Sequence, residues 1–153
     1  GDMNMVAAGH YIRTLRESRR LTQADVIERA AQWLNGKKID STTLWRIETG
    51  RKKTRSDILS AVVEAVEGNS DDVARLMNDP LATPADGEER ARQWFDRVEI
   101  ARMDRLIIET KSDDLDAVIG DLRQEYQHDP GVLTFLRGAL AGWRARGGVA
   151  PKR

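Results

Sequence analysis

The sequence predicts an all-α protein, and two observations support this prediction. Apolar residues recur at helical spacing along most of the 153-residue chain, and no segment alternates polar and apolar residues convincingly, as a half-buried strand would. Aromatic residues make up only 5% of the chain and there are four prolines, a composition that favours helices over sheet. Cysteine is absent, which excludes disulfides, thiolate metal sites and cysteine nucleophiles.

Five helices are expected in the first half of the chain. They cover residues 10–20, Gln23 to the stop signal Asn35-Gly36, Ser41 to Gly50, Ser56 (as the cap) to Gly68-Asn69, and Ser70 to Met77. Thr22 is a good N-cap for the second helix, and either Asp40 or Ser41 can cap the third. Gly50 is placed as a C′ glycine would be. Residues 35–40 read as a loop between the second and third helices.

The second half is expected to contain three more helices. Residues 86–111 form one long candidate, Ser112 caps the next helix, and Asp129-Pro130 starts the last one, which stops at Gly147-Gly148. The stretch from Asn78 to Gly87 has two prolines and little apolar content, which is typical of a linker. The expected organisation is therefore a domain over residues 9–78, a linker over 79–87 and a helical domain over 88–147.

The net charge of zero hides an asymmetry between the two ends of the chain. Residues 10–56 carry twelve Lys or Arg and five Asp or Glu, a net charge of +7, whereas residues 57–153 carry a net charge of −6. A basic domain suits a polyanionic partner, although charge also fluctuates along any chain.

Four sequence pieces in the basic region occur in an informative order. They are Ile12-Arg13-Thr14-Leu15-Arg16-Glu17, Leu21-Thr22-Gln23-Ala24-Asp25-Val26, Thr43-Leu44-Trp45-Arg46-Ile47-Glu48-Thr49-Gly50, and the basic loop after Gly50. Together they resemble the helix-turn-helix transcriptional regulators of the phage lambda repressor and Cro type, also called the xenobiotic-response-element (XRE) family. The resemblance covers residues 9 to about 78. It departs from the family at residues 31–40, which are several residues longer than the family's tight turn and leave the angle between the two helices open.

The resemblance implies a five-helix lambda-repressor-like domain whose third helix enters the major groove of double-stranded DNA. Its base-contacting residues would be Ser41, Thr42, Trp45 and Arg46. Arg46 can donate two hydrogen bonds to guanine, or it can hold a phosphate or pair with a nearby acid. Trp45 can touch a thymine methyl or pack on Trp33, and packing is slightly favoured because an exposed indole is costly.

The resemblance also implies contacts to the DNA backbone and one internal ion pair. The phosphate-contacting residues would be Thr22, Gln23, Thr43, Arg51, Lys52, Lys53 and Arg55. Free N–H groups and the helix dipole favour an anion at Gln23, although simple N-capping explains the start of that helix equally well, and the basic loop can also be merely solvated. Arg16 and Glu48 would form a partly buried structural salt bridge between the first and third helices.

We expect the second half of the chain to form a homodimer. Three amphipathic helices bury little core by themselves, and one small domain touches only half of a palindromic site. The apolar residues shared between core and interface would be Leu115, Val118, Ile119, Leu122, Leu133, Leu136, Leu140 and Trp143. The alternative is a self-contained core in a monomer.

The predicted function is a transcriptional regulator, a repressor that binds a palindromic operator as a homodimer. The alternative is an antitoxin-like protein whose C-terminal half binds a partner protein while its N-terminal half autoregulates. An enzyme is not expected, because His10 and His128 lack ligand spacing and no Gly-rich phosphate loop follows a strand. No cofactor, metal or membrane contact is expected, no motif indicates a small-molecule effector, and the location should be cytoplasmic, in a bacterium or from a phage, at the nucleoid.

Overall fold

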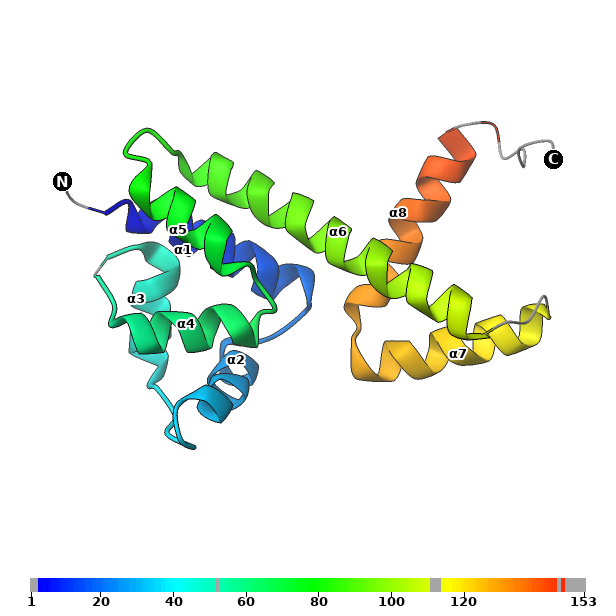
Figure 1. Cartoon of the computed structure of the whole chain (residues 1–153), viewed down its shortest axis with the longest axis horizontal. Coiled ribbons are helices and arrows are strands. Elements are labelled where there is room, and N and C mark those ends of the chain that lie inside the picture. The colour runs from blue at the N-terminus through cyan, green and yellow to red at the C-terminus, as the bar shows by residue number, and fades with distance from the viewer. Residues whose placement is uncertain (1–2, 52, 111–113, 146, 148–153) are drawn as a thin grey trace. The chain divides into compact units, whose positions relative to one another are not determined.

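A computed structural model describes residues 3–51, 53–110, 114–145 and 147, without the side chains of residues 103–110, 115, 135 and 143. Over these residues the chain forms eight α-helices, one 3-10 turn and no strand, so the all-α prediction is confirmed (Figure 1). The elements are α1 (Met5–Ser18), α2 (Gln23–Ala30), η1 (Ala31–Trp33), α3 (Ser41–Thr49), α4 (Ser56–Ala65), α5 (Ser70–Asn78), α6 (Pro84–Thr110), α7 (Leu115–His128) and α8 (Gly131–Ala145). No helix in these ranges is long and apolar enough to cross a membrane.

The chain divides into two compact units, Gly1–Arg97 and Val98–Arg153. In the first unit α1 packs against α3 and α5, and α2 packs against α4. The side chains between them are apolar residues at helical spacing, as the sequence predicts, and include Ile12, Leu15, Val26, Leu44, Ile47, Val62 and Val66, all without solvent exposure. Burial of these side chains is the main favourable contribution to folding of this unit.

Helix α1 begins earlier than the expected residue 10. The side chain of Asn4 caps it, since its Oδ1 accepts a hydrogen bond from the backbone N–H of Ala7 at 3.2 Å. The Asn4 Nδ2 also donates to the carbonyl of Ala82 at 2.7 Å. This asparagine therefore joins the start of α1 to the segment before α6, a contact that spacing along the chain does not reveal.

The starts of two other helices also differ from the expected ones. Helix α4 begins at Ser56 with Arg55 in the capping position, so Ser56 is not the cap. Asp114 caps α7, and its side chain accepts a hydrogen bond from the N–H of Asp116 at 3.1 Å. Ser112, the cap expected from the sequence, lies outside the described residues.

Helix α6 begins with a capping box before Pro84. The hydroxyl of Thr83 accepts a hydrogen bond from the N–H of Asp86 at 3.1 Å, and the Asp86 carboxylate accepts one from the N–H of Thr83 at 2.8 Å. Proline at the first helical position loses no hydrogen bond, because that N–H has no partner within the helix. These local signals start α6 inside the segment 79–87 that the sequence marks as a linker.

The first fourteen residues of α6 pack onto the first unit, whose boundary lies at Arg97 rather than near residue 78. Gly87 allows this, because a Cβ atom there would collide with the backbone carbonyl of Ala7. Ala91 and Phe95 follow at helical spacing and are buried in the same core as α1. The segment 79–87 thus belongs to the first unit. It has few apolar residues because it includes the short surface connection between α5 and α6.

A buried arginine further holds α6 to α1. The Arg19 side chain is 1% exposed, and its guanidinium lies 5.2 Å from the centre of the Phe95 ring. Its Nη1 pairs with Glu67 Oε2 at 2.8 Å, and its Nε donates to the carbonyl of Val66 at 3.1 Å. A buried charge requires such partners. The indole N–H of Trp94 donates to the carbonyl of Glu67 at 2.8 Å and joins α6 to the same turn.

The second unit comprises the remainder of α6 with α7 and α8. Arg102 on α6 pairs with Glu99, which is fully buried, and with Asp129 at the end of α7. Among the side chains described in this unit, Val132 is the one hydrophobic residue that is fully buried. The residues expected at a dimer interface are half-buried or exposed where they are described: Val118, Ile119, Leu122, Leu133 and Leu136 are half-buried, and Leu140 is exposed. The side chains of Leu115 and Trp143 lie outside the described set.

Candidate nucleic-acid interface

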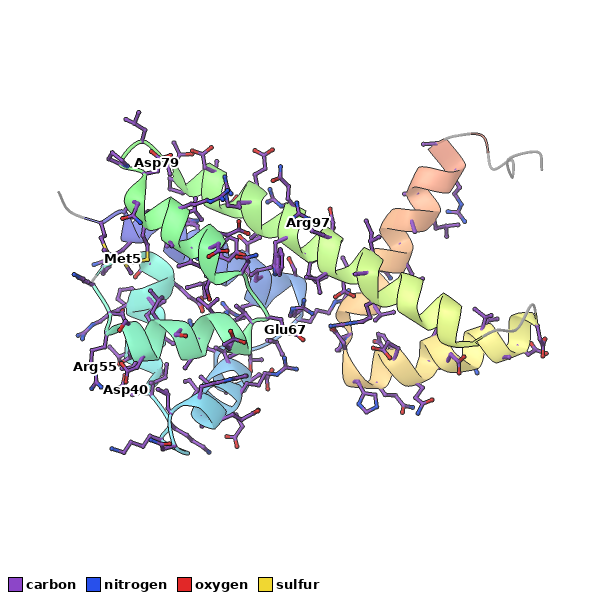
Figure 2. The ribbon with its side chains drawn as sticks, viewed as in Figure 1. Met5, Asp40, Arg55, Glu67, Asp79 and Arg97 are labelled. Carbon is purple, nitrogen blue, oxygen red and sulfur yellow. The ribbon has the colours of Figure 1, made fainter. Side chains whose placement is uncertain are left out.

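Helix α3 has a defined start and a defined end. The Asp40 side chain accepts a hydrogen bond from the N–H of Thr43 at 2.7 Å, so Asp40 rather than Ser41 is the N-cap. This bond holds the pKa of the Asp40 carboxyl below its ordinary value. Gly50 ends the helix in the left-handed conformation with φ +67°, which is strained for other residues. Asp40 is labelled in Figure 2 at the start of α3.

The two faces of α3 differ sharply in exposure. Leu44, Ile47 and Glu48 are buried against the rest of the first unit. The residues expected to contact bases are all exposed to solvent: Ser41, Thr42, Trp45 and Arg46. Since positions three and four apart lie on one side of a helix, these four side chains form a continuous outer face. Within the described part of the chain, Arg46 forms no ion pair, although its charge contributes to the lowered pKa of the Asp40 carboxyl.

The predicted pair of Arg16 and Glu48 is present and holds α3 to α1. Arg16 Nε donates to Glu48 Oε2 at 2.9 Å, and Nη2 donates to Oε1 at 3.0 Å. The third guanidinium nitrogen, Nη1, donates to the carbonyl of Leu21 at 3.0 Å. The Glu48 side chain is 3% exposed and that of Arg16 is 15% exposed. The pair therefore joins α1, α3 and the start of the α2 segment, and it leaves neither charge unpaired.

Helix α2 begins with a complete capping box. The Thr22 hydroxyl accepts from the N–H of Asp25 at 3.1 Å, and the Asp25 carboxylate accepts from the N–H of Thr22 at 2.8 Å. The bond from the Thr22 N–H lowers the pKa of the Asp25 carboxyl. A hydrogen bond from the Thr22 hydroxyl to the same carboxylate lowers this pKa further. Gln23 follows at the first helical position and is half-buried.

Cationic side chains surround a hollow beside α3. The hollow has a volume of about 200 Å³ and is lined by Thr43, Arg46, Lys53, Thr54, Arg55 and Ile58. It brings together residues expected to touch bases and residues expected to touch phosphates. Arg55 also donates to the Asp57 carboxylate at 2.9 Å, with both side chains exposed, and exposed pairs of this kind exchange partners at little cost. Lys52 lies outside the described residues.

Trp45 packs against Arg51, a partner that the sequence analysis did not expect for it. The Arg51 guanidinium lies 5.0 Å from the centre of the Trp45 ring. Gly50 reverses the chain, and the Arg51 N–H bonds the carbonyl of Arg46 at 3.1 Å, so the Arg51 side chain returns onto α3. Trp45 is 44% exposed and Trp33 is 48% exposed. The αL glycine directly before an arginine is the signal that would have indicated this stacking.

The long connection between α2 and α3 is an ordered part of the first unit. Leu34 and Ile39 pack at the edge of the core, and the N–H of Gly36 bonds the carbonyl of Ala31 at 2.9 Å. Lys38 pairs with Glu28 on α2 at 2.7 Å. The additional residues therefore form a loop held at both ends, and they leave α2 and α3 in contact with each other. No functional role was expected for the exposed lysines of this loop.

Comparison with known proteins agrees with this geometry. Residues 7–76 match the family model described as a helix-turn-helix domain. A relative from Herpetosiphon aurantiacus, a 15.4 kDa protein in the HgiDIIM 5′ region, is 33% identical over 135 residues, which cover 88% of this chain and 93% of the relative. No solved structure matches. The similarity to the relative thus extends beyond the helix-turn-helix domain into the second unit.

Proposed function

Because the chain carries a helix-turn-helix domain over residues 7–76 and belongs to the family of the Herpetosiphon aurantiacus protein, we propose that it is a sequence-specific DNA-binding repressor of the lambda repressor and Cro type. The observation that carries this proposal is the outer face of α3, which is exposed, carries the cationic Arg46 and lies beside a basic hollow. A helix of this kind fits the major groove of B-DNA. No catalytic step, cofactor or metal forms part of the proposal.

The outer face of α3 supplies the base contacts. Arg46 is the main determinant, since its guanidinium can donate two hydrogen bonds to guanine O6 and N7. The absence of an ion pair at Arg46 among the described residues supports this assignment, because a paired guanidinium would first have to lose its partner. Ser41 and Thr42 at the start of α3 are adaptable donors and acceptors that add little specificity by themselves.

Phosphates on either side of the groove are held by the start of α2 and by the basic loop. Gln23 has the N–H groups of the first turn of α2 beside it, and such a helix start attracts an anion. On the other side of α3, Lys53 and Arg55 share the hollow with Thr43. Contacts from these residues to phosphates position α3 but do not read the base sequence.

The second unit makes the proposed repressor a homodimer. Its described side chains bury one hydrophobic residue completely, while five of the residues expected at the interface are half-buried and Leu140 is 46% exposed. Half-buried apolar side chains of this kind gain further burial from a second copy. Two copies then place two α3 helices on a palindromic site, about one helical turn of DNA apart.

Selection of bound duplexes from a random pool, followed by a salt titration, tests the proposal. A palindromic consensus is expected, and each neutralised phosphate should contribute about −0.9 to the slope of log affinity against log salt concentration. Binding to no duplex at low salt would refute the proposal. Sedimentation over a concentration series tests the dimer separately, and a monomer at about ten times the Kd for DNA would contradict it.

A further inference from the structure

The outer face of α3 carries one apolar side chain, that of Trp45. Trp45 lies between Ser41 and Arg46 on this face, and 44% of its side chain is exposed. A large indole in water is unfavourable unless some partner removes part of its surface from solvent. The Arg51 guanidinium provides part of that cover, at 5.0 Å from the ring centre. The remaining indole surface is open to whatever occupies the groove side of α3.

The contact with Trp45 also bears on which other groups Arg51 can bind. No carboxylate lies within ion-pair distance of Arg51 in the described ranges, so the indole is its principal side-chain partner there. A guanidinium carries five N–H donors, so one that lies over an aromatic ring can still donate to another acceptor. Arg51 can therefore bind a phosphate and support the indole at the same time. A cation–π contact of this kind restricts the rotamers of Trp45 before DNA arrives.

In the major groove the apolar group that a base pair offers is the C5-methyl of thymine. We propose that Trp45, supported by Arg51, reads this methyl group at one position of each half-site. The inference rests on the proposed function, because it requires α3 to enter the major groove. It assigns to Trp45 a preference for thymine over bases without the methyl, and to Arg51 the role of a positioning residue.

The test replaces thymine by deoxyuridine in the duplex that the full-length protein selects. This change removes the methyl group and leaves every hydrogen-bonding group of the base in place. Replacement of this thymine in a single half-site should weaken binding about fourfold, which corresponds to about 0.8 kcal/mol for one buried methyl group. Sequence-specific binding with no effect of deoxyuridine at any position would overturn this inference and leave the proposed function standing. The absence of sequence-specific binding would refute both this inference and the proposed function.

Variants of the protein assign the effect to Trp45. Trp45→Ala should bind the thymine and deoxyuridine duplexes with equal affinity. Trp33→Ala is the matched control, since this indole is 48% exposed but lies on η1 rather than on α3, and it should keep the fourfold difference. Arg51→Gln should reduce both the difference and the salt dependence of binding. A fourfold difference that persists in Trp45→Ala would show that another residue reads the methyl group and would overturn the assignment.

Discussion

Arg16 and Glu48 face one another as a bidentate pair, with both hydrogen bonds between 2.9 and 3.0 Å, although 32 residues separate them along the chain. Glu48 lies on the inner face of α3 and is buried, so its charge depends on Arg16. The pair joins the inner face of α3 to α1 beside the buried side chains of Leu44 and Ile47. It thereby helps to hold α3 with its outer face, which we propose to contact DNA, toward solvent.

Glu48→Gln should destabilise the first unit by about 3 kcal/mol, because it leaves the Arg16 charge largely buried and without its carboxylate. Urea unfolding followed by tryptophan fluorescence measures this loss. Glu17→Gln is the control, since Glu17 pairs with Arg13 at the same 2.9 Å, but both side chains are more than half exposed. That exposed pair should contribute less than about 0.5 kcal/mol. Equal losses in the two variants would contradict a stabilising role for the buried pair.

Gly87→Ala should separate α6 from α1, because the added Cβ would meet the carbonyl of Ala7, whose carbon lies 3.0 Å from the Cβ position. A backbone group yields less easily than a side chain, and overpacking of this kind typically costs about 1–3 kcal/mol. The same substitution at Gly138 meets nothing within 4 Å and should instead stabilise α8 by about 0.5–1 kcal/mol. Thermal unfolding of both variants distinguishes a packing effect from a change in helix propensity. A stabilised Gly87→Ala protein would refute the close contact.

Asp40 should make the stability of the first unit depend on acid pH. Its pKa in the folded protein lies below the ordinary value of 3.8, mainly because the Thr43 N–H donates to its carboxylate. The charged cap therefore contributes its full stabilisation at pH values above the ordinary pKa of the unfolded chain. This contribution is lost as the pH falls through the lower pKa of the folded protein.

Asp40→Asn keeps a capping oxygen but does not titrate. Urea midpoints measured at a series of pH values from neutral to acid should fall less steeply for this variant than for the wild type. Parallel curves would show that Asp40 does not contribute to the acid sensitivity.

Arg46→Ala and Lys53→Ala should separate the reading of bases from the holding of phosphates. Arg46→Ala is expected to relax the preference at one base position per half-site by about 1–3 kcal/mol. Lys53→Ala should weaken binding to all duplexes similarly and reduce the salt slope by about 0.9 for each protomer. Competition between the selected duplex and single-base variants, repeated at several salt concentrations, measures both effects. An unchanged base preference in Arg46→Ala would refute its role, and an altered one in Lys53→Ala would contradict a phosphate contact.

The candidate interface could be predicted to a large extent because its signals are local or carried by family resemblance. Helical spacing placed Leu44 and Ile47 inside, and it left Ser41 and Arg46 outside, as the structure has them. The contact between Arg51 and Trp45 was missed. Only Trp33 and a thymine methyl were considered as partners of Trp45, and not that the left-handed Gly50 directs the chain at Arg51 back toward α3. Whether any of these side chains contacts DNA stays a prediction.

The sequence by itself determined the helices, most of their inward faces, the turn at Gly50 and the basic character of the front half, because each depends on neighbours within one or two turns of the chain. The start of α1 at Met5 was missed although Asn4 caps this helix locally. The tertiary structure alone decided that the start of α6 belongs to the first unit. This placement depends on contacts between segments more than 70 residues apart, such as Asn4 with Ala82 and Gly87 with Ala7. Residues that meet only in the folded chain leave no periodic or capping signal in the sequence, and so their pairing is visible only when the helices pack.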